Sequence, residues 1–542
     1  MGKAYDYIIC GAGSAGCVLA ARLSEDPSVK VLLLEAGGKN NGLLVKMPAG
    51  VGGIIFEKNA YNWGFHTEPE PHLDNRKIWW PRGKGLGGSS AINGMIYTRG
   101  HPNDYDEWRQ MGLSGWAWDD VLPYFRRLEN HHGGASDQHG EGGPLTVSRG
   151  ESDSAFHDAF LEAGRQAGYP ITDDFNGAQQ EGFGLYDLTI KDGQRWSTRR
   201  AYLDGAKDRP NLTCVTGARL TKVTIENGRA TGVEYVRGKS ASPLSATADR
   251  DVILSAGAVH TPQMLQVSGI GPADHLRSIG VTPIHDLPGV GANLQDHIDV
   301  VLTWKSEGLE TVYALRKGLG ALKMAGTYAF TGKGHGRQQF LESGAYVKSR
   351  EGIDRPDLQL HAVLAILTAI EEDDVKSDGF SVHACVLRPE SRGTVMAGSA
   401  DPLADPLIHA NYMASPKDMD TLRRGVRIIE DVVGQPALAP YRRDRVQPPG
   451  PLKTDEEVDA WIRSRAETLY HPVGTCKMGR AEDPMAVVDE QLKVLGIEGL
   501  RVVDASVMPT LVGANTNAAT IMIAEKAADM ILKQPAPARV AA

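Results

Sequence analysis

A glycine-rich turn between two apolar segments near the N-terminus limits what this 542-residue chain can fold into. Residues 7–10 form a short apolar run that stops at the glycines of residues 11–16, and residues 31–34 form a second run. Between the runs, residues 14–23 place apolar side chains at helical spacing. Strand, glycine-rich turn, helix and strand are typical of the first βαβ unit of a doubly wound sheet. We therefore predict an α/β fold that begins with a nucleotide-binding unit.

Three glycines and one carboxylate in this unit have the spacing of a dinucleotide-binding site. Gly11 permits the tight turn, Gly13 lets the backbone approach a pyrophosphate, and Gly16 lets the helix pack on the strand. The helix N-terminus adds free N–H groups and a partial positive charge. Glu35 ends the second strand, where its carboxylate can accept hydrogen bonds from ribose hydroxyls. The alternative is a glycine-rich turn with a surface glutamate, and this motif alone does not distinguish NAD from FAD.

A second glycine-rich segment, residues 83–95, predicts a loop that lies against a phosphate or a flat ring. Five of its residues are glycine, which makes it unsuitable for the interior of a helix or a strand. Such a loop exposes backbone N–H groups, and the nearby Trp79, Trp80 and Ile92 favour its burial. The alternative is a flexible loop at the surface.

Later segments repeat the nucleotide-domain pattern, while the middle of the chain differs from it. Alternating residues at 358–363 and 394–396 favour an antiparallel sheet in the middle. We therefore predict a nucleotide-binding domain made of separate segments, with a second domain inserted. The other expected elements are strands with turns in 208–234, a strand at 251–257, a helix that begins at Thr261-Pro262, a strand at 500–504 and a last helix at 517–533.

Residues 469–475 place a histidine between two halves of the expected nucleotide site. The first half is the N-terminal βαβ unit, and the second consists of residues 504–505 and 515–517. A neutral histidine such as His471, with a reference pKa of about 6.5, suits the role of a general base at pH 7. Asn515 can hydrogen-bond a substrate oxygen and hold its geometry. The alternatives are a buried structural histidine and an asparagine that caps a helix.

Several long motifs resemble those of the glucose–methanol–choline (GMC) oxidoreductase family. The glycine loop at 83–95 and its continuation to residue 106 are similar to the first signature of this family, and residues 257–271 are similar to the second. Residues 288–297 and 391–395 resemble further family segments. The similarity covers nearly the whole chain and is strongest to bacterial choline-dehydrogenase-like alcohol dehydrogenases.

The resemblance implies an α/β fold, α+β overall, in which a Rossmann-like FAD-binding domain carries an inserted substrate domain built on an antiparallel sheet. It implies an FAD-dependent alcohol dehydrogenase that oxidises a primary alcohol to an aldehyde by hydride transfer to flavin N5. The electrons are expected to pass to a quinone-like, cytochrome or other non-oxygen acceptor. Two alternatives stay open: an alcohol oxidase that uses dioxygen, and a lyase that binds FAD without redox turnover. The expected boundaries are 1–150, 205–295 and 470–535 for the FAD-binding domain, 151–204 and 296–469 for the substrate-binding domain, and 536–542 for a disordered tail.

The same resemblance implies roles for particular residues. His471 and Asn515 match the catalytic pair of the family, with His471 as the base that removes the hydroxyl proton. Val223 matches the contact on the adenine side. The implied FAD contacts are Gly11, Gly13, Ser14, Ala15, Gly16, Glu35, Trp63, Gly87, Asn93, Gly94, Met95, Ile96, Val223, Tyr470, Asp504, Ala505, Asn515 and Thr516.

Two positions depart from the pattern of some family members. Ile92 stands where some members attach FAD through a histidine, so we expect FAD to be bound non-covalently. Arg388 stands where some choline-oxidising relatives use a second histidine, which weakens choline as the substrate. Glu342 is a candidate substrate-facing carboxylate, with a solvated loop acid or a structural ion pair as the alternative.

Charge and cysteine content argue against several other functions. The chain has 58 basic and 67 acidic residues and a net charge of −9, which provides no basic surface for nucleic acid. Its five cysteines form no CxxC pair, and no metal site is expected, including at His131-His132 with the nearby Asp137 and His139. No signal peptide and no run of 18 apolar residues is visible, so we expect no transmembrane segment. We expect a cytoplasmic location and leave open whether the protein docks on the inner membrane.

Overall fold

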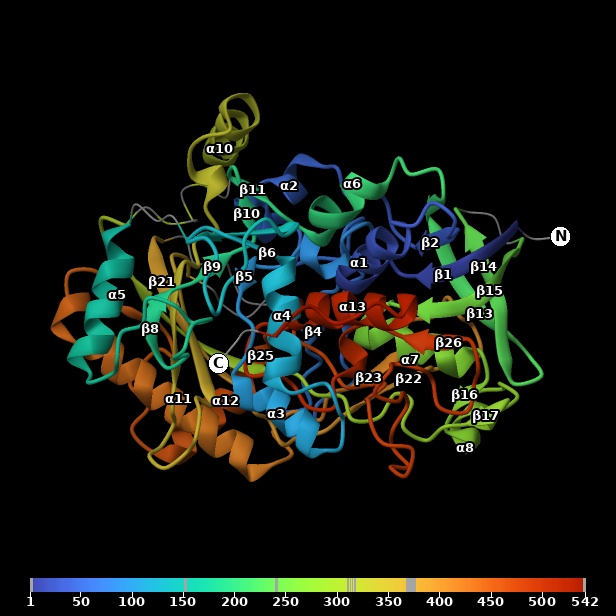
Figure 1. Cartoon of the computed structure of the whole chain (residues 1–542). Helices are drawn as coiled ribbons and strands as arrows, with labels where there is room; N and C mark the ends of the chain where they lie inside the picture. The colour runs from blue at the N-terminus through green and yellow to red at the C-terminus, as the bar shows by residue number, and fades with distance from the viewer. Residues whose placement is uncertain are drawn as a thin grey trace.

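The computed structural model of the chain is built around two large sheets (Figure 1). Residues of both sheets line one cavity. One sheet follows the nucleotide-binding pattern and the other is antiparallel, so the expected α/β class, α+β overall, is confirmed. The structure describes residues 3–150, 154–238, 242–309, 311, 313, 315, 318–366 and 377–539.

The first sheet confirms the βαβ unit at the N-terminus. Strands β1 and β2 run parallel, and α1 (Ser14–Leu23) connects them. All residues of β2 are buried, as expected for a strand that is covered on both faces. The turns expected within 208–234 separate β12, β13 and β14. The strand order is β12 (Leu212–Thr216), β2 (Val31–Glu35), β1 (Lys3–Cys10), β15 (Leu244–Leu254), β14 (Arg229–Arg237) and β13 (Ala218–Glu226), with β26 (Leu500–Val502) paired to β15.

The last helix, α13 (Thr516–Leu532), packs against α1 and so brings the two ends of the chain together. Its Glu525 is fully buried, and Arg22 of α1 and Arg127 of α4 (Trp118–Leu128) both form ion pairs with it. Two guanidinium groups compensate the carboxylate for the loss of water. The nucleotide site is therefore assembled from both ends of the sequence.

Helix α7 (Gly257–Val267) begins four residues before the expected start at Thr261-Pro262, so that prediction was wrong. Pro262 lies inside the helix, where it has no N–H to donate to the carbonyl of Ala258. The hydroxyl of Thr475 donates to that carbonyl instead, at 2.7 Å. The helix tolerates its proline because a distant side chain supplies the missing donor.

The second sheet is antiparallel and has two unlike faces. Leu358, Leu360 and Ala362 of β20 belong to the apolar core that includes α11 (Pro416–Gly434), whereas His361 lines the cavity on the other face. The antiparallel sheet expected from residues 358–363 is confirmed. The strand order is β24 (Arg445–Gln447), β18 (Ile298–Lys305), β21 (Gly379–Val386), β20 (Leu358–Val363), β19 (Ser343–Val347) and β8 (Gly182–Leu185), with β25 (Glu467–Thr468) paired to β18.

Short elements connect and cover the two sheets. The expected strand at 394–396 forms, but it pairs with β23 in a separate small sheet. Residues 534–539 contain no helix or strand, and residues 540–542 of the expected tail lie outside the described residues. The remaining elements are α2 (Leu43–Lys46), η1 (Pro48–Gly53), β3 (Phe65–His66), β4 (Trp79–Trp80), η2 (Gly88–Ala91), β5 (Ile96–Tyr97), α3 (Pro102–Gln110), β6 (Glu129–His131), β7 (Leu145–Arg149), α5 (Ala155–Gln166), β9 (Asp187–Leu188), β10 (Ile190–Lys191), β11 (Gln194–Arg195), η3 (Arg199–Leu203), α6 (Asp204–Ala206), β16 (Ile270–Gly271), α8 (Ala273–Ser278), β17 (His285–Asp286), α10 (Gly318–Thr331), η4 (His335–Arg337), β22 (Thr394–Met396), β23 (Leu407–His409), η5 (Pro436–Leu438), α12 (Asp455–Arg465) and η6 (Ala505–Val507).

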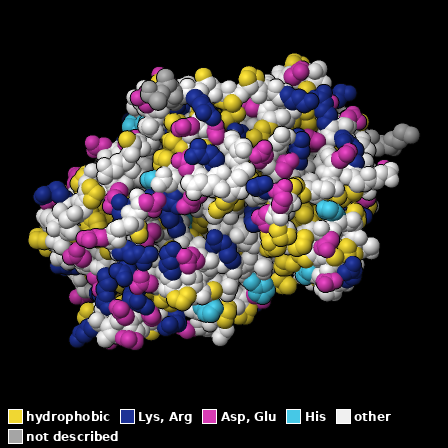
Figure 2. All heavy atoms as spheres, turned by 60° about the horizontal axis from the view of Figure 1, so that its bottom comes forward, with side chains coloured by type: hydrophobic (Ala, Val, Ile, Leu, Met, Phe, Trp, Pro, Cys, Tyr) yellow, Lys and Arg dark blue, Asp and Glu magenta, His cyan; other side chains and the backbone are white. Residues whose placement is uncertain are grey.

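The surface carries charges of both signs. On the face shown in Figure 2, basic and acidic side chains lie among one another. This mixture agrees with the net charge of −9 and differs from the single basic stripe of a nucleic-acid-binding surface. Among the described residues, no helix is both long enough and apolar enough to cross a membrane.

Candidate active site

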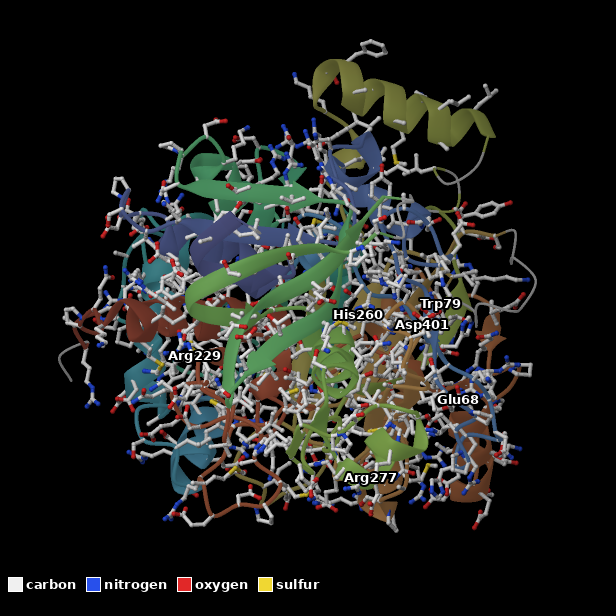
Figure 3. The ribbon with its side chains drawn as sticks, turned by 90° about the vertical axis from the view of Figure 1, so that its right-hand side faces the viewer. Glu68, Trp79, Arg229, His260, Arg277 and Asp401 are labelled. Carbon is white, nitrogen blue, oxygen red and sulfur yellow. The ribbon has the colours of Figure 1, made fainter. Side chains whose placement is uncertain are left out.

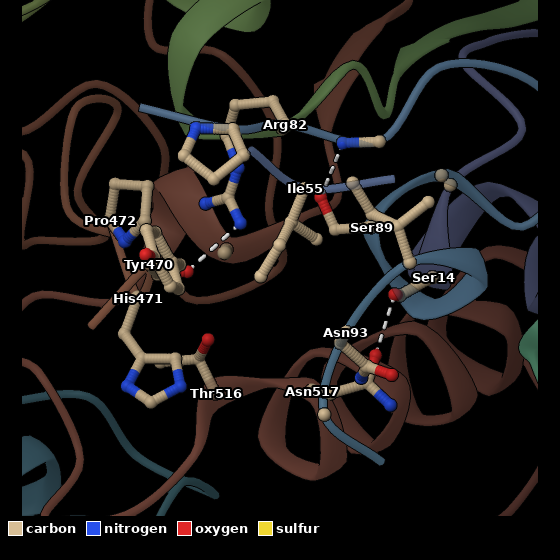
Figure 4. Close-up of a pocket in the computed structure, with 18 of the residues that line it drawn as sticks. Ser14, Ile55, Arg82, Ser89, Asn93, Tyr470, His471, Pro472, Thr516 and Asn517 are labelled. Carbon is tan, nitrogen blue, oxygen red and sulfur yellow. Dashed lines mark hydrogen bonds between the residues drawn. The ribbon is translucent and has the colours of Figure 1, made fainter. Parts of the chain in front are cut away.

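The cavity between the sheets has a volume of about 910 Å³ and collects most of the residues expected to bind the cofactor. In Figure 4, Tyr470, His471 and Pro472 stand on one side of the open space and Ser14 and Asn93 on the other. The expected residues that line it are Gly11, Gly13, Ser14, Ala15, Glu35, Trp63, Asn93, Gly94, Met95, Ile96, Tyr470, His471, Asp504, Ala505, Asn515 and Thr516.

The backbone around the cavity leaves room for a dinucleotide. No protein atom lies within 4 Å of a Cβ built on Gly94 or on Gly257, and both residues line the cavity. The two glycine loops touch, since a Cβ on Gly88 would come within 2.6 Å of the Gly13 backbone. The start of α13 also lines the space, where its N–H groups favour negative charge. The residues present therefore fit FAD. The glycine loops and the helix N-termini suit its phosphates, and the cavity has room for its ring.

Glu35 holds three loop segments together. Its carboxylate accepts hydrogen bonds from the N–H groups of Ala12 at 2.9 Å, Gly37 at 2.7 Å and Gly85 at 2.9 Å. Three such bonds to one buried carboxylate tie the first glycine turn to the glycine loop at 83–95. Glu35 also lines the cavity. The same side chain therefore has an observed structural role and remains the predicted ribose contact.

Three of the expected cofactor contacts lie outside the cavity lining. Gly16 packs so tightly that a Cβ would sit 1.8 Å from the Gly11 carbonyl oxygen, which agrees with its packing role. The N–H of Gly87 donates to Ala12 at 2.8 Å instead of facing the cavity. Val223 is fully buried and donates its N–H to Ser268. On the same strand, the residues that line the cavity are Ala218, Arg219 and Leu220.

His471 and Asn515 meet at the cavity, and a second histidine completes the group. Asn515 Nδ2 lies 3.2 Å from His471 Nε2, and His471 Nδ1 lies 2.9 Å from His297 Nδ1. The contact forms because residues 295–299 pair antiparallel with residues 467–473. The sequence analysis did not assign a role to His297, although it lies in a segment, 288–297, that carried the family resemblance.

The hydrogen bonds determine which nitrogen of His471 carries the proton. His297 Nε2 lies 3.1 Å from the Leu387 carbonyl oxygen, which can only accept, so Nε2 of His297 bears the hydrogen. Burial lowers the pKa of His297 to about 3, so this ring is neutral and its Nδ1 is an acceptor. His471 must therefore donate from Nδ1. Its Nε2 is left with a lone pair directed toward Asn515.

The side chain of Asn515 is fixed by three neighbours. Its Oδ1 accepts from Thr98 Oγ1 at 3.0 Å and from Gln359 Nε2 at 3.2 Å, which leaves Nδ2 for His471. Asn515 occupies the N-cap position of α13, but its side chain makes no capping hydrogen bond. Helix capping, the alternative role considered for this residue, is therefore not the role of the side chain.

The surroundings of His471 keep it neutral. Burial, and next the fields of His297 and Arg82, lower the pKa of His471 well below its ordinary value. The N–H of His471 donates to Asp296 at 2.7 Å, which anchors the backbone beside the cavity. Arg82 also lines the cavity and donates to the Tyr470 carbonyl at 2.9 Å (Figure 4). An unprotonated imidazole next to a guanidinium is suited to take a proton while negative charge develops nearby.

The antiparallel sheet contributes polar side chains to the far end of the cavity. His383 Nδ1 lies 2.6 Å from Asp299 Oδ2, and His361 lies opposite His383 on the neighbouring strand. Asp299 Oδ1, His361 Nδ1 and His383 Nε2 are buried and have no hydrogen-bond partner among the described residues. Burial raises the pKa of Asp299, and the contact with His383 lowers it. Buried polar atoms without partners on a cavity wall indicate a place for a polar group of a ligand.

Two residues that the sequence analysis related to the substrate, Glu342 and Arg388, lie outside the cavity lining. Glu342 is 2% exposed and outside the cavity lining, and its carboxylate lies 3.3 Å from His157, which favours the structural role over a contact with the substrate. Its neighbour Leu341 faces the cavity instead. Arg388 is also outside the lining and pairs with Asp104. The residue at position 388 therefore carries no argument against choline.

A second group of polar side chains lies away from the cavity. One donor atom each of His131, His132 and Asp187 falls within 4.8 Å of the others, which is a spacing that could hold a metal ion. Arg149 Nε lies 3.6 Å from Asp187, and Asn176 also donates to it. A guanidinium so close to the carboxylate opposes a divalent cation. The positions Asp137 and His139 do not belong to this group.

Comparisons with known proteins agree with the fold and the cavity. Family models described as GMC oxidoreductase match residues 5–299 and 389–524. The chain is 47% identical to the oxygen-dependent choline dehydrogenase of Xanthomonas euvesicatoria pv. vesicatoria, over 99% of this chain and 97% of that protein. It is 44% identical to the mitochondrial choline dehydrogenase of Mus musculus, over 98% of this chain and 90% of that protein.

Two solved structures extend the comparison. The pyridoxine 4-oxidase from Mesorbium loti has a TM-score of 0.88 and 32% identity, and the match covers 98% of this chain and 100% of that one. A formate oxidase from Aspergillus oryzae, studied for the modification of its FAD, has a TM-score of 0.91 and 28% identity, with 98% of each chain covered. The sheets described above therefore belong to an architecture that is known to carry a flavin.

Proposed function

Because this chain belongs to the GMC oxidoreductase family, we propose that it is an FAD-dependent dehydrogenase that oxidises a primary alcohol to an aldehyde. FAD is the cofactor, and it is held non-covalently, since the side chain of Ile92 in the cavity wall has no atom able to bond to it. The observation that carries the proposal is the relay of His297, His471 and Asn515 beside a cavity that fits a dinucleotide.

Oxidation requires the alcohol to lose one proton and one hydride. His471 Nε2 takes the hydroxyl proton, since the relay leaves a lone pair on that nitrogen. Asn515 Nδ2 lies beside it and can donate to the substrate oxygen, which holds the hydroxyl against the base. When bound, FAD supplies the hydride acceptor at N5. The charge that develops on the oxygen must then be compensated by groups of the protein.

Arg82 and the start of α13 supply the compensating positive charge. The guanidinium of Arg82 lines the cavity and lowers the pKa of His471 through its field. The same field stabilises negative charge on the substrate oxygen as the proton leaves. Thr516 and Asn517, at the N-terminus of α13, also line the cavity. The partial positive charge of the helix end favours the electron-rich side of the cofactor.

The far end of the cavity supports an alcohol with a polar or cationic group. The sheet contributes two carboxylates, Asp299 and Glu467, to the lining. Glu467 pairs with Arg76 at 3.2 Å, whereas Asp299 Oδ1 has no hydrogen-bond partner among the described residues. A buried carboxylate oxygen attracts a cation or a donor group on the substrate. Together with the names of the relatives, this places choline-like alcohols first among the substrates to test.

We further propose a non-oxygen acceptor, quinone-like or a cytochrome, for the electrons. Dioxygen is the alternative acceptor, because the Xanthomonas relative is named oxygen-dependent. The cavity residues do not discriminate between the two, so the acceptor must be measured by the reoxidation rate.

The test is anaerobic reduction of the holoprotein by a panel of alcohols, followed by admission of air. Choline, its uncharged isostere with a tert-butyl group, benzyl alcohol and glycerol cover the cationic, apolar, aromatic and polyol classes. We expect the flavin absorbance to bleach with at least one primary alcohol and to return slowly in air. Rapid return in air would establish the oxidase instead. Flavin that stays oxidised with every alcohol would refute redox turnover and favour the lyase.

A further inference from the structure

Helix α10 (Gly318–Thr331) stands clear of the body of the molecule at the top of Figure 1, and Figure 3 shows it from a second side. Among the described residues, Tyr328 is the buried residue of this helix. Tyr328 is 6% exposed, and its hydroxyl donates to the carbonyls of Gly193 at 3.0 Å and Lys46 at 3.3 Å. The helix is therefore held on one face and open on the other.

The open face of α10 is apolar. Leu319, Leu322 and Phe330 are 85%, 70% and 92% exposed, whereas Ile284, the next most exposed large hydrophobic residue among those described, reaches 49%. At 100° per residue the three side chains fall within an arc of about 80° on the helix, nearly opposite Tyr328. Three large apolar side chains on one exposed stripe cost free energy in water and indicate a surface that is covered in use.

The described charged residues on α10 and directly after it are positive. Lys323 is the charged residue of α10, which contains no acidic residue. Lys333 and Arg337 lie two and six residues after the end of α10, and Lys333 is exposed. A helix with a leucine and phenylalanine face and flanking basic residues is suited to the boundary between lipid headgroups and acyl chains. The rest of the chain has an excess of acidic residues, so the local charge is opposite to the net charge of −9.

From these observations we propose that the stripe formed by Leu319, Leu322 and Phe330 docks on an anionic lipid surface. The three side chains insert at the level of the headgroups, and Lys323, next to them on the same face, contacts the phosphates. Each basic residue near such a membrane adds attraction that weakens with salt.

The size of the stripe favours a lipid surface over a protein partner. A stable protein interface buries about 800 Å² on each side, and three side chains on one short helix offer less than that. An amphipathic helix needs no complementary partner surface, because lipid adapts to its apolar face. In a two-fold dimer the stripe could meet only its own copy, since outside α10 the exposed large hydrophobic residues that are described are at most 49% exposed, and two such stripes again fall short of about 800 Å² on each side.

Docking through α10 places the mouth of the cavity at the lipid surface. After α10 the chain forms η4 (His335–Arg337), which packs against η1 (Pro48–Gly53). Val51 of η1 and Phe340, just after η4, both line the cavity. A lipid-soluble electron acceptor could then reach the flavin without crossing water. This last consequence rests on the proposed function, whereas the docking itself does not.

The test is co-sedimentation of the FAD-loaded protein with vesicles of equal parts phosphatidylcholine and phosphatidylglycerol. We compare the wild-type protein with a triple variant, Leu319→Ser, Leu322→Ser and Phe330→Ser. We expect the triple variant to bind at least about ten-fold more weakly, because most of the apolar surface that inserts is lost. Binding of the wild-type protein should weaken in high salt and on vesicles of phosphatidylcholine alone.

A matched control changes three exposed hydrophobic residues elsewhere. Met111, Ile284 and Leu403 are 46%, 49% and 41% exposed, and their replacement by Ser should leave vesicle binding unchanged. Flavin absorbance and activity with a water-soluble dye verify that each variant is folded and test the proposed function separately. Wild-type protein that does not sediment, or a triple variant that sediments equally well, would overturn the proposal. A dimer that the triple variant disrupts, without vesicle binding, would assign the stripe to a second copy.

Discussion

The two sheets border the same cavity with different chemistry. From the nucleotide-binding side the cavity receives two glycine-rich loops, with glycines such as Gly13 and Gly94, and the first turns of two helices. From the antiparallel side it receives side chains, including Asp299, His361 and His383. Backbone groups are positioned by local turns, whereas side-chain groups depend on the register between distant strands. Cofactor binding in this molecule is thus a local property, and substrate handling is a long-range one.

The largest expected effect separates these two halves. Replacement of His471 by Ala removes the base, and we expect kcat to fall by about 10³-fold, because the hydroxyl proton then has no acceptor. The FAD content should stay near that of the wild type, since the cofactor is held mainly by backbone. Stopped-flow reduction of the flavin and its absorbance per protein measure the two quantities. Loss of FAD together with activity would show that the two halves are not separable.

The next effect concerns the backbone half. Gly88 has φ +50° and lies against Gly13, so Gly88→Ala forces a Cβ to 2.6 Å from backbone. We expect a loss of stability of about 3 kcal/mol and a lower FAD content. Gly205→Ala is the control, because a Cβ there meets no atom within 4 Å. Thermal unfolding with and without added FAD measures both variants, and equal melting temperatures would contradict the tight approach of the two loops.

Local sequence was sufficient for the backbone half of the site. Gly11, Gly13 and Glu35 were predicted because a strand, turn and helix in sequence determine where they lie. For Val223 the contact stays a prediction: the cavity lining on its strand consists of Ala218, Arg219 and Leu220, and nothing local defines which part of a long strand borders a cavity. The early start of α7 was missed because a distant hydroxyl, that of Thr475, satisfies the carbonyl freed by proline.

The side-chain half was only partly predictable. His471 and Asn515 came from the family resemblance, and they do meet. The sequence did not reveal a role for His297, although this residue lies in a segment that resembles the family. Its contact with His471 arises only because residues 295–299 pair with residues 467–473. For Glu342 the sequence left a substrate-facing and a structural role open, because nothing local shows that its neighbour Leu341 lines the cavity and that Glu342 does not. The protonation relay exists only in three dimensions.

The relay gives a smaller, more specific effect. In His297→Phe the acceptor for His471 Nδ1 is lost, so His471 no longer has a fixed tautomer. We expect kcat to fall by about 30-fold with little change in KM, as for other partners that orient a catalytic imidazole. His297→Gln offers a carbonyl oxygen in the same region and should restore most of the rate. Equal losses in both variants would indicate a packing role rather than a tautomer role.

Asp299 tests whether the antiparallel face recognises charge. In Asp299→Asn the carboxylate is lost but the size is kept, and His383 loses its 2.6 Å partner. We expect kcat/KM for choline to fall about ten-fold and that for its uncharged tert-butyl isostere to change little, because only the cation interacts with the carboxylate. Steady-state rates with both alcohols give the ratio. A parallel fall for both alcohols would remove Asp299 from charge recognition.

The smallest expected effect is a level pH profile across neutrality. Burial is the first cause that lowers the pKa of His471 below its ordinary value of about 6.5. A base with a lowered pKa is unprotonated above that pKa, and its activity is lost only as the pH falls through it. We therefore expect kcat/KM to stay constant from pH 8 down through the ordinary histidine value of about 6.5, with the acid limb only at lower pH. The residual activity of His471→Ala should lack this acid limb. An acid limb centred above pH 7 would mean that the cavity favours the charged imidazolium, and the side-chain half would then differ from the neutral relay inferred here.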